Sequence, residues 1–403
     1  MTRVLPTGWE EKTLGEVCSF DRGLTYKKSD EVSLSSNVVL RANNIDLSTN
    51  SLNFDELKYL SPNFEIPADK KVQKDCLLIC TASGSKSHLG KVALIDKDYG
   101  YAFGGFMGLL LPDKFIDSHY LFYALTSKPY FDFVSHLTDG ANINNLKWSQ
   151  LQDFKLIIPS LPEQKRIVEK LDKIFADIDK AKENTQKNLE NAKEVFAVRL
   201  NCILENPKKT WEQRTFAEIC DVRDGTHDSP KYLKEGYSLL TSKNLKNGEL
   251  VFDKIKYISR EDYEHINERS KVDIGDVLFA MIGTIGNPVV VTEEPNYAIK
   301  NMALFKHSKQ LNPFFLKYLL ESNLILNKMQ KEANGTTQKF VSLGYLRKFP
   351  ILLPPTEEQE QIVAELDSLR AKAQELKQIY TKKLADLDEL KQSVLQQAFS
   401  GKL

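Results

Sequence analysis

The chain has 403 residues and a mass of 46.0 kDa, and 41% of its residues are hydrophobic, which is enough to bury the cores of about two or three domains. Its formal net charge is +0, which does not favour nucleic-acid binding, although a basic face can coexist with acidic helices elsewhere. No window approaches the roughly 20 apolar residues that cross a bilayer, and Met1–Trp9 lacks the apolar run of a signal peptide. We therefore expect a cytoplasmic protein without membrane contact.

The first portion, residues 2–160, has the pattern of a mixed α/β domain. Apolar and β-branched runs bounded by Gly, Asn, Asp and Ser predict strands at NVVLR (37–41), CLLIC (76–80) and KVALID (91–96). The stretch SHYLFYALTS (118–127) has helical spacing instead. Together these segments predict a compact domain in which strands and helices alternate.

A long helix is predicted to follow, opening on LPEQKRIVEKLD (161–172). Pro159 and Pro162 stand where proline is tolerated, before or in the first turn, and Glu163 suits the positive end of the helix dipole. An a/d seam of alternating three- and four-residue steps predicts a coiled coil that is weak in its middle, and it comprises Leu171, Ile174, Ile178, Ala181, Thr185, Asn188, Ala192 and Val195. The segment ENPKK (205–209) marks its end.

The remainder of the chain has the same plan. Residues 210–355 again predict a mixed α/β domain, with strands at DVLFAMIG (276–283) and NPVVVT (287–292) and helical spacing at 312–329. TEEQEQIVAELD (356–367) then opens a second long helix after Pro354 and Pro355, with Glu357 and Glu358 in its first turn. Its predicted seam comprises Ile362, Leu366, Leu369, Ala373, Leu376, Tyr380, Lys383, Leu387, Leu390 and Val394.

The two helix openings are copies of one phrase. Gln164 and Gln359 stand at an offset of 195 residues (359 − 164), and the register continues without insertion through the helices and back to Gly140 and Gly335. Upstream the halves stay similar but drift in register, as GWEEKTLGEVCSF and TWEQRTFAEICDV show. Each half therefore combines a variable domain with a strictly spaced helix.

We divide the chain at 1–160 (first domain), 161–206 (first helix), 207–355 (second domain) and 356–403 (second helix). A helix of about 40 residues is about 60 Å long. Duplicated units that contact one another tend toward two-fold symmetry, so we expect an antiparallel coiled coil that separates the two domains.

Catalytic motifs are absent from the sequence. There is no GxxxxGK[ST] loop, and the glycines of FGGFMG and IGTIG are interpreted as turns rather than as a nucleotide site. NPFF (312–315) resembles an amino-methylation signature but lacks its second proline, so we interpret Asn312 as a helix N-cap and Pro313 as the first helical position. The DELK strings at 55–58 and 388–391 are attributed to chance.

No metal or cofactor site is predicted either. The six histidines show no metal spacing, and CLLIC is an apolar run with no His or Cys cluster nearby, so buried free thiols are expected there. We expect a protein that is not an enzyme.

The residues carry a resemblance across essentially the whole chain. Two diverged domains, each followed by a proline-led EQ…IV…LD helix, and the ending LKQSVLQQAFSGKL make the chain similar to the specificity (S) subunit of type I restriction-modification enzymes. The resemblance implies that each domain is a target recognition domain that reads one half of a bipartite double-stranded DNA sequence. It also implies that the helices set the gap between the halves and dock two methyltransferase (M) subunits, and that motor-nuclease (R) subunits join them. Catalysis would then reside in those partners.

Polar, loop-like stretches at equivalent places in the two halves are the candidate DNA contacts, because Arg, Lys, Asn and Gln pair with base edges and Ser, Thr and Lys with phosphates. In the first half these are Thr25, Lys27, Lys28, Arg41, Asn43, Asn44, Ser85, Lys86, His88, Asn142, Asn144 and Asn145. In the second half they are Thr226, His227, Lys231, Lys243, Asn244, Thr284, Asn287, Thr336, Thr337, Gln338 and Lys339. The stretches GANINN (140–145) and GTTQK (335–339) rank highest, because each precedes a helix junction.

Two alternatives remain open at this point. The chain could serve a related methylation system that has no nuclease, which changes the partners alone. It could also be a scaffold whose paired domains bind protein, and its neutral charge is the main support for that hypothesis. The steep salt dependence of DNA binding distinguishes a DNA reader from such a scaffold.

Overall fold

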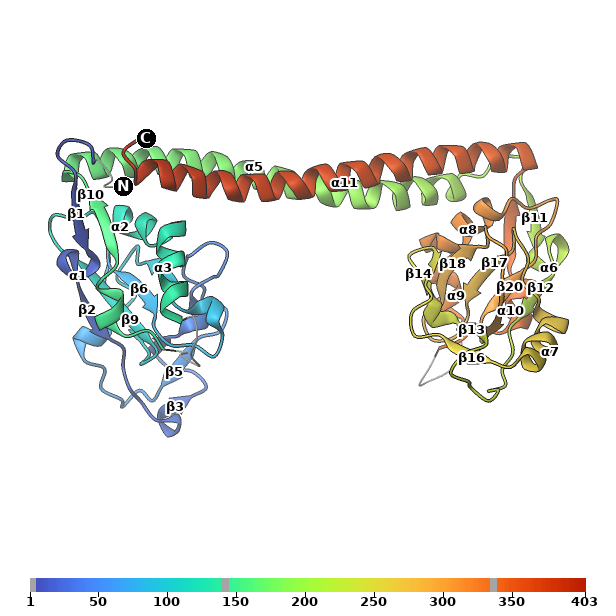
Figure 1. Cartoon of the computed structure of the whole chain (residues 1–403), viewed down its shortest axis with the longest axis horizontal. Helices are drawn as coiled ribbons and strands as arrows, with labels where there is room; N and C mark the ends of the chain where they lie inside the picture. Colours follow the sequence, from blue (N-terminus) through green and yellow to red (C-terminus); the bar gives the residue numbers. More distant parts are fainter. Residues whose placement is uncertain (1–4, 139–144, 334–338) are drawn as a thin grey trace. The chain divides into compact units, whose positions relative to one another are not determined.

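The structure, a computed structural model, describes residues 5–138, 145–333 and 339–403. The chain divides into two compact units: unit 1 is Met1–Thr185 with Lys382–Leu403, and unit 2 is Gln186–Thr381. Each unit contains mixed sheets and short helices together with a portion of each of the two long helices (Figure 1). The mixed α/β class and the internal repeat predicted from the sequence are confirmed.

Unit 1 is built around two four-stranded sheets. Its strands are β1 (Glu10–Thr13), β2 (Cys18–Arg22), β3 (Glu31–Val32), β4 (Asn37–Leu40), β5 (Lys58–Leu60), β6 (Leu77–Cys80), β7 (Val92–Leu94), β8 (Ala102–Phe103), β9 (Met107–Pro112) and β10 (Lys155–Ile158). Its short helices are α1 (Leu14–Val17), α2 (Ser118–Ala124), α3 (Lys128–Thr138) and α4 (Trp148–Leu151), with 3₁₀ turns η1 (Lys28–Asp30), η2 (Ala42–Asn44), η3 (Ala68–Lys70) and η4 (Lys86–His88). The sheet orders are β2-β9-β6-β7 and β3-β5-β4-β8, and β1 pairs with β10.

The alternation of side chains along β6 shows how the layers of unit 1 pack. Leu77 and Ile79 belong to the core that the first sheet shares with α2 and α3, whereas Leu78 and Cys80 face the core shared with the second sheet. Successive side chains of a strand point to opposite faces, so a strand that is apolar throughout must be covered on both sides. The first sheet is therefore the middle layer between the helices and the second sheet.

Unit 2 repeats this arrangement. Its strands are β11 (Glu212–Thr215), β12 (Val222–Asp224), β13 (Tyr237–Thr241), β14 (Leu245–Lys246), β15 (Glu249–Leu250), β16 (Lys256–Ile258), β17 (Val277–Ala280), β18 (Gly286–Val290), β19 (Tyr297–Lys300), β20 (Ala303–Phe305) and β21 (Pro350–Leu353). Its helices are α6 (Phe216–Ile219), α7 (Arg260–Ser270), α8 (Pro313–Glu321), α9 (Asn323–Lys331) and α10 (Leu343–Lys348), with η5 at Ser242–Asn244.

The sheet topology identifies equivalent strands in the two units. The order β12-β20-β17-β18 repeats β2-β9-β6-β7, and β16-β13-β19 repeats β5-β4-β8, including the parallel pairs β4–β8 and β13–β19. Val277 and Phe279 face the core with α8 and α9, and Leu278 and Ala280 face the second sheet, as their counterparts do in unit 1. The units differ locally, since α7 stands in unit 2 where unit 1 has the single turn η3.

The helical stretch predicted at 312–329 forms two helices. Asn312 caps α8 by accepting hydrogen bonds from the backbone N–H groups of Phe314 (2.9 Å) and Phe315 (3.3 Å), and Pro313 occupies the first turn, as predicted. The helix then stops at Ser322, whose side chain accepts from Ile325 N and begins α9. A serine that caps a new helix competes with continuation of the old one, which the apolar spacing alone did not reveal.

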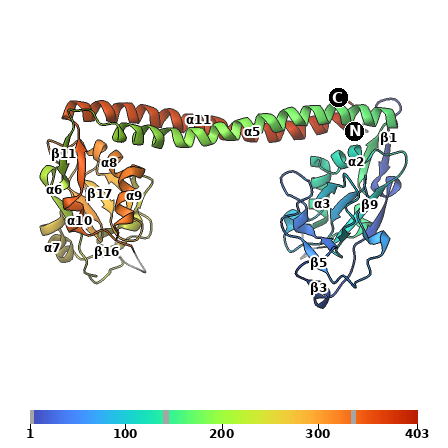
Figure 2. The same cartoon turned by 180° about the vertical axis from the view of Figure 1, so that it is seen from behind.

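The two long helices are α5 (Leu161–Glu205) and α11 (Thr356–Ala398), and within each unit they lie side by side (Figures 1 and 2). In unit 1 the pairs Lys182–Asp388 and Asp179–Lys391 (3.8 Å) join them. From Asp179 to Lys182 the residue number rises along α5, whereas the number of the partner on α11 falls from Lys391 to Asp388. The pairing is therefore antiparallel, as predicted.

In unit 2 the same pairing rests on Arg199 and Glu365 (2.6 Å) and on the Arg370 guanidinium, which lies 4.2 Å from the ring centroid of Phe196. These contacts again run in opposite directions along the two helices. The antiparallel arrangement therefore holds in both units.

The predicted seams are correct near the helix openings and shift in the middle. Leu171, Ile178, Thr185 and Ala192 on α5 and Ile362, Leu366 and Val394 on α11 are buried, whereas Asn188, Val195, Leu376, Lys383 and Leu390 are exposed. On α5 the buried positions continue at Leu189, Leu200 and Leu204 instead. A straight helix drifts about 20° per heptad from a 3.5-residue repeat, so a strict a/d assignment loses the seam after a few turns.

The glutamine of the opening phrase joins α5 to unit 1. Gln164 is fully buried, and its Nε2 donates to the carbonyl oxygens of Phe115 (3.0 Å) and Pro159 (2.9 Å). Its Oε1 accepts from the backbone N–H of Asp117 at 2.8 Å, the residue that caps α2. One buried amide therefore satisfies three backbone groups where the sheet domain meets the helix.

Gln359 makes the same contacts in unit 2. Its Nε2 donates to the carbonyl oxygens of Gln310 and Pro354, both at 2.9 Å, and its Oε1 accepts from Asn312 N at 2.8 Å. About two turns further along each long helix, Tyr123 donates to Asp172 in unit 1 just as Tyr318 donates to Asp367 in unit 2. Contacts between each long helix and its own domain thus explain why the EQ and LD residue pairs are repeated.

Candidate nucleic-acid interface

Two of the predicted loops of unit 1 meet at the turn between β8 and β9. Leu24 donates its backbone N–H to Phe103 O at 2.7 Å and forms a bridge with Gly104, which sets the loop 25–28 against this turn. The approach depends on Gly23, because a Cβ there would lie 1.9 Å from the Gly104 carbonyl oxygen. On the other side, Gly104 N donates to Leu40 O at 2.9 Å, which places the turn beside the segment 41–44.

The other two loops join from the opposite side of the same turn. Thr81 N and Ala82 N both donate to Phe106 O at 3.0 Å, and the loop 83–88 follows directly. Leu146 N donates to Thr81 O at 2.7 Å, and Ala82 forms a bridge with Asn145. The stretches 25–28, 41–44 and 83–88 and the described residue Asn145 of the fourth stretch therefore converge on residues 104–106.

Unit 2 brings its predicted loops together in the same pairs. Thr226 N donates to Ile299 O at 3.0 Å, and the parallel pairing of β13 with β19 places the segment that begins at Thr241 beside Lys300. Gly283 N donates to Lys339 O at 2.9 Å, which joins the remaining two loops. Gly225 has the role of Gly23, because its Cβ would lie 2.4 Å from Ile299 O.

Most of the predicted side chains are accessible. In unit 1 those of Thr25, Lys27, Lys28, Asn43, Ser85, Lys86 and Asn145 are exposed, and those of Arg41 and His88 are half-buried. In unit 2 those of His227, Lys231, Lys243, Thr284 and Lys339 are exposed, and those of Thr226 and Asn287 are half-buried. The residues Asn142, Asn144, Thr336, Thr337 and Gln338 lie outside the described residues.

Asn44 and Asn244 differ from the rest of this set. Asn44 is fully buried; its Oδ1 accepts from Arg41 N (2.8 Å) and its Nδ2 donates to Asn53 O (2.8 Å). Asn244 has the same role, accepting from Thr241 N at 3.0 Å and donating to Val251 O at 2.9 Å. Both amides hold their own loops and have no free edge to present to a base, so we exclude them from the proposed interface.

His227 is held by acceptors on both sides of its ring. Nδ1 lies 2.9 Å from Asn301 Oδ1, and Nε2 lies 2.9 Å from the buried carboxylate of Asp224, which also pairs with Arg269. Both ring nitrogens donate when the imidazole is protonated. The hydrogen bonds to Asn301 and then to Asp224 raise the pKa of His227 above its ordinary value, against opposition from burial and the Arg269 charge. This loop therefore favours a cationic side chain.

Three residues of these clusters were not identified from the sequence. Phe106 stands at the tip of the unit 1 turn with 72% of its side chain exposed. In unit 2, Asn301 positions His227, and the buried Lys300 donates to Asp228 O (2.8 Å) and Ser229 Oγ (2.6 Å). The run FGGFMG, in which an aromatic residue follows two glycines, could have indicated a turn at Phe106. Nothing in the sequence indicates that the side chain of Phe106 is exposed.

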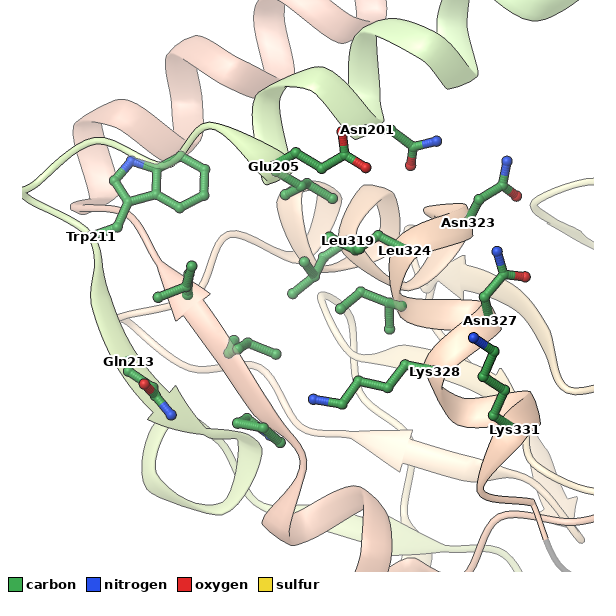
Figure 3. A pocket seen from close by; sticks show the side chains of 15 residues that line it. Asn201, Glu205, Trp211, Gln213, Leu319, Asn323, Leu324, Asn327, Lys328 and Lys331 are labelled. Carbon is green, nitrogen blue, oxygen red and sulfur yellow. The ribbon is translucent and has the colours of Figure 1, made fainter.

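A pocket with a volume of about 690 Å³ lies elsewhere in unit 2, between the end of α5, the pair β11–β21 and α9 (Figure 3). Leu204, Leu319, Ile351 and other apolar side chains form much of its lining, and Asn201, Asn323, Asn327, Lys328 and Lys331 add polar groups. Among the described residues that line it, Glu205 is the sole carboxylate, so it offers no pair of groups for acid–base chemistry.

Metal-binding and membrane-spanning features were also sought. Among residues 5–138, 145–333 and 339–403, His, Cys, Asp and Glu do not gather in groups that could hold a metal ion. Within the same ranges, no helix combines the length and apolar character that a bilayer-spanning segment requires. Cys18, Cys76, Cys80 and Cys220 are buried free thiols, whereas Cys202 is exposed.

Two repeated units, each of which brings its predicted polar loops together in pairs and contains a portion of the two long helices, define a tandem recognition protein. The family model "Type I restriction modification DNA specificity domain" matches residues 6–191 and 208–384. The chain belongs to this family, the specificity subunits of type I restriction-modification systems, which recognise the DNA target.

Two similar specificity subunits align with nearly the full length of this chain. The EcoKI specificity subunit of Escherichia coli (strain K12) is 27% identical over 426 residues, which cover 99% of this chain and 90% of that protein. The StySPI specificity subunit of Salmonella potsdam is 27% identical over 441 residues, with coverage of 99% and 90%.

Solved structures share the fold. A chain from a structure of type I R-M complex assembly and conformational transition superposes with a TM-score of 0.77 at 21% identity, covering 99% of this chain and 100% of that one. The HsdS subunit from Thermoanaerobacter tengcongensis superposes with a TM-score of 0.68 at 19% identity, with coverage of 99% and 98%.

Proposed function

We propose that each unit recognises one half of a bipartite double-stranded DNA target through its converging loops. The observation that carries this proposal is that two sets of loops, far apart in sequence, come together in the same pairs in both units. Their exposed Lys, Ser and Thr side chains suit phosphates, and their exposed Asn side chains and the half-buried Arg41 suit base edges. A formal net charge of +0 for the whole chain does not exclude a local attraction for DNA at these loops.

The residues proposed to contact DNA are the predicted ones without Asn44 and Asn244. The five that lie outside the described residues, Asn142, Asn144, Thr336, Thr337 and Gln338, stay in the proposal on sequence grounds alone. The proposed domain limits also stay at 1–160, 161–206, 207–355 and 356–403.

α5 and α11 are the elements that set the gap between the half-sites and dock two methyltransferase subunits. Exposed apolar side chains on the helices support docking, and these are Val195 and Val198 on α5 and Leu376, Ile379 and Leu390 on α11. Motor-nuclease subunits then complete the restriction enzyme. The chain itself is non-catalytic, needs no cofactor and acts in the cytoplasm beside the chromosome.

The test is to co-express the chain with the methyltransferase subunit encoded beside it and to map methylated bases in a host genome. One asymmetric motif of two short half-sites with a fixed gap is the expected result. A soluble complex that binds DNA without any sequence preference contradicts the proposal.

The neutral net charge left a protein-binding scaffold open as an alternative at the level of the sequence, and the family to which the chain belongs does not support it. Binding of duplex DNA measured between about 50 and 200 mM salt separates the two, since counterion release makes DNA affinity fall by orders of magnitude. A methylation-only system gives the same motif and salt dependence but no nuclease partner in a pull-down.

A further inference from the structure

Phe106 is the most exposed aromatic residue in the part of the chain that the structure describes. Its side chain is 72% exposed, and no described aromatic ring or cation packs against it. A single exposed apolar residue is common on protein surfaces and carries no inference by itself. The position of Phe106 and the rigidity of its backbone distinguish it.

The backbone beneath the ring is fixed on both sides. The Phe106 carbonyl oxygen accepts three hydrogen bonds, from Thr81 N, Ala82 N and Thr81 Oγ1, each at 3.0 Å. The turn closes on itself through Met107 N and Gly104 O at 2.8 Å. A phenylalanine has two side-chain torsions, so an aromatic side chain on a fixed turn loses little entropy when it is buried by a ligand.

The ring also stands where the proposed DNA-binding loops of unit 1 meet. A Cβ on Gly105 would lie 3.6 Å from Thr25 Oγ1, and one on Gly104 would lie 4.0 Å from Arg41 Cγ. Asn145 is joined to the same turn through its bridge with Ala82. Phe106 is therefore an apolar tip surrounded by residues with cationic and hydrogen-bonding side chains.

The equivalent position in unit 2 carries different chemistry. Gly23 N donates to Met107 O at 3.1 Å in unit 1, and Gly225 N donates to Met302 O at 2.9 Å in unit 2, so the residue before each methionine is equivalent. That residue is Phe106 in one unit and Asn301 in the other. Asn301 has a polar side chain engaged with His227, so one scaffold offers an apolar contact at one half-site and a polar contact at the other.

We propose that Phe106 is a specificity-determining residue that contacts the C5-methyl group of a thymine in the major groove of the half-site recognised by unit 1. This inference rests on the proposed function. The thymine methyl is the apolar feature of the major groove, and phenylalanine is among the side chains that contact it. The half-site of unit 1 then contains at least one A·T pair, and the half-site of unit 2 lacks this contact.

The experiment combines Phe106→Ala with replacement of thymine by uracil, which removes the methyl group alone. The full chain in complex with its methyltransferase subunits is titrated against duplexes that carry uracil at one thymine position at a time, on either strand. Phe115→Ala is the matched control, because Phe115 is an exposed phenylalanine of the same unit beyond the other end of β9.

For the wild-type complex, uracil at one position should weaken binding about three- to fivefold, the effect expected from one buried methyl group. In Phe106→Ala the same replacement should change affinity less than about twofold, because two changes to one contact are not additive. Phe115→Ala should retain the full uracil effect. The non-additivity between Phe106→Ala and the uracil replacement should be confined to one half-site.

Three results overturn the inference: a unit 1 half-site without thymine, an equal uracil effect in wild type and Phe106→Ala, or a loss in Phe106→Ala that is the same on every DNA sequence. Each of these leaves sequence-specific binding by the wild type intact. A wild-type complex that shows no sequence preference contradicts the proposed function instead, so the two failures are distinguishable.

Discussion

At the scale of single residues, the glutamines that open the two long helices explain the most prominent repeat in the sequence. Gln164 and Gln359 stand at the same step of their helices because each satisfies two carbonyls and one N–H at the domain junction. Residues that recur in a duplicated chain can thus report a structural joint rather than a binding site.

Gln359→Leu should destabilise unit 2 by about 2–4 kcal/mol, since it leaves one buried and two partly buried backbone groups without the side chain that satisfies them. Urea unfolding followed by circular dichroism measures the change. Gln361→Leu, an exposed position on the same helix, is the control and should shift stability by less than about 0.5 kcal/mol. Equal effects of the two substitutions would show that the buried hydrogen bonds contribute little.

His227 predicts a pH dependence. Its folded-state pKa is raised above the ordinary value of 6.5 by Asn301 and Asp224, so its stabilising contribution is fully present below pH 6.5 and is lost as pH rises through the folded pKa. The melting temperature of wild type relative to His227→Gln should therefore fall over that range. An NMR titration of the imidazole gives the pKa directly, and a value below 6.5 contradicts the assignment.

Residue types alone did not separate structural from exposed polar side chains. Asn43 and Asn44 are adjacent and identical in type, but Asn43 is exposed whereas Asn44 is buried with its amide satisfied within its own loop. Phe106 was not identified as a candidate contact for the converse reason, because a phenylalanine is expected in a core. The exposure of a side chain depends on the tertiary fold, which residue types alone do not specify.

At the scale of elements, the openings of the long helices could be predicted from proline, acidic residues and apolar spacing, and α5 and α11 begin where these signals stand. The strands at CLLIC and DVLFAMIG were also identified, since they are apolar on both faces. The middle of the seam was not identified, because the small residues there do not form a clear apolar stripe. A straight helix also departs progressively from a heptad repeat.

Leu366 and Leu376, both predicted in the seam of α11, should behave differently. Leu366 is fully buried in the core of unit 2, so Leu366→Ala should cost about 2–5 kcal/mol of stability. Leu376 is 39% exposed, so Leu376→Ala should change stability by less than about 0.5 kcal/mol and should instead weaken methyltransferase binding. Denaturation and a binding titration measure the two effects, and loss of stability without loss of binding in Leu376→Ala contradicts the docking proposal.

At the scale of the whole molecule, neutral charge does not prevent local attraction for DNA. Lys27→Ala with Lys28→Ala in unit 1, or Lys231→Ala with Lys243→Ala in unit 2, should lower affinity for all duplexes and reduce the slope of log K against log salt by about 1–2. The methylated motif should stay unchanged, because phosphate contacts carry no base information.

Lys114→Ala and Lys309→Ala are the matched controls for these lysines. They occupy equivalent exposed positions near the helix junctions, at an offset of 195 residues (309 − 114), away from the converging loops. They should leave both affinity and salt slope unchanged. A slope that falls equally in the controls would indicate general electrostatic attraction rather than contacts made by the loops.

Unit 1 is discontinuous along the chain, and this affects the order in which the protein can be completed during translation. Val394, Leu395 and Ala398 belong to the same core as Leu14 and Tyr120, although hundreds of residues are synthesised between them. The whole of unit 2, residues 186–381, leaves the ribosome before that core can close. The half of the protein that is begun first is therefore finished last, and until then it must persist with an open apolar surface.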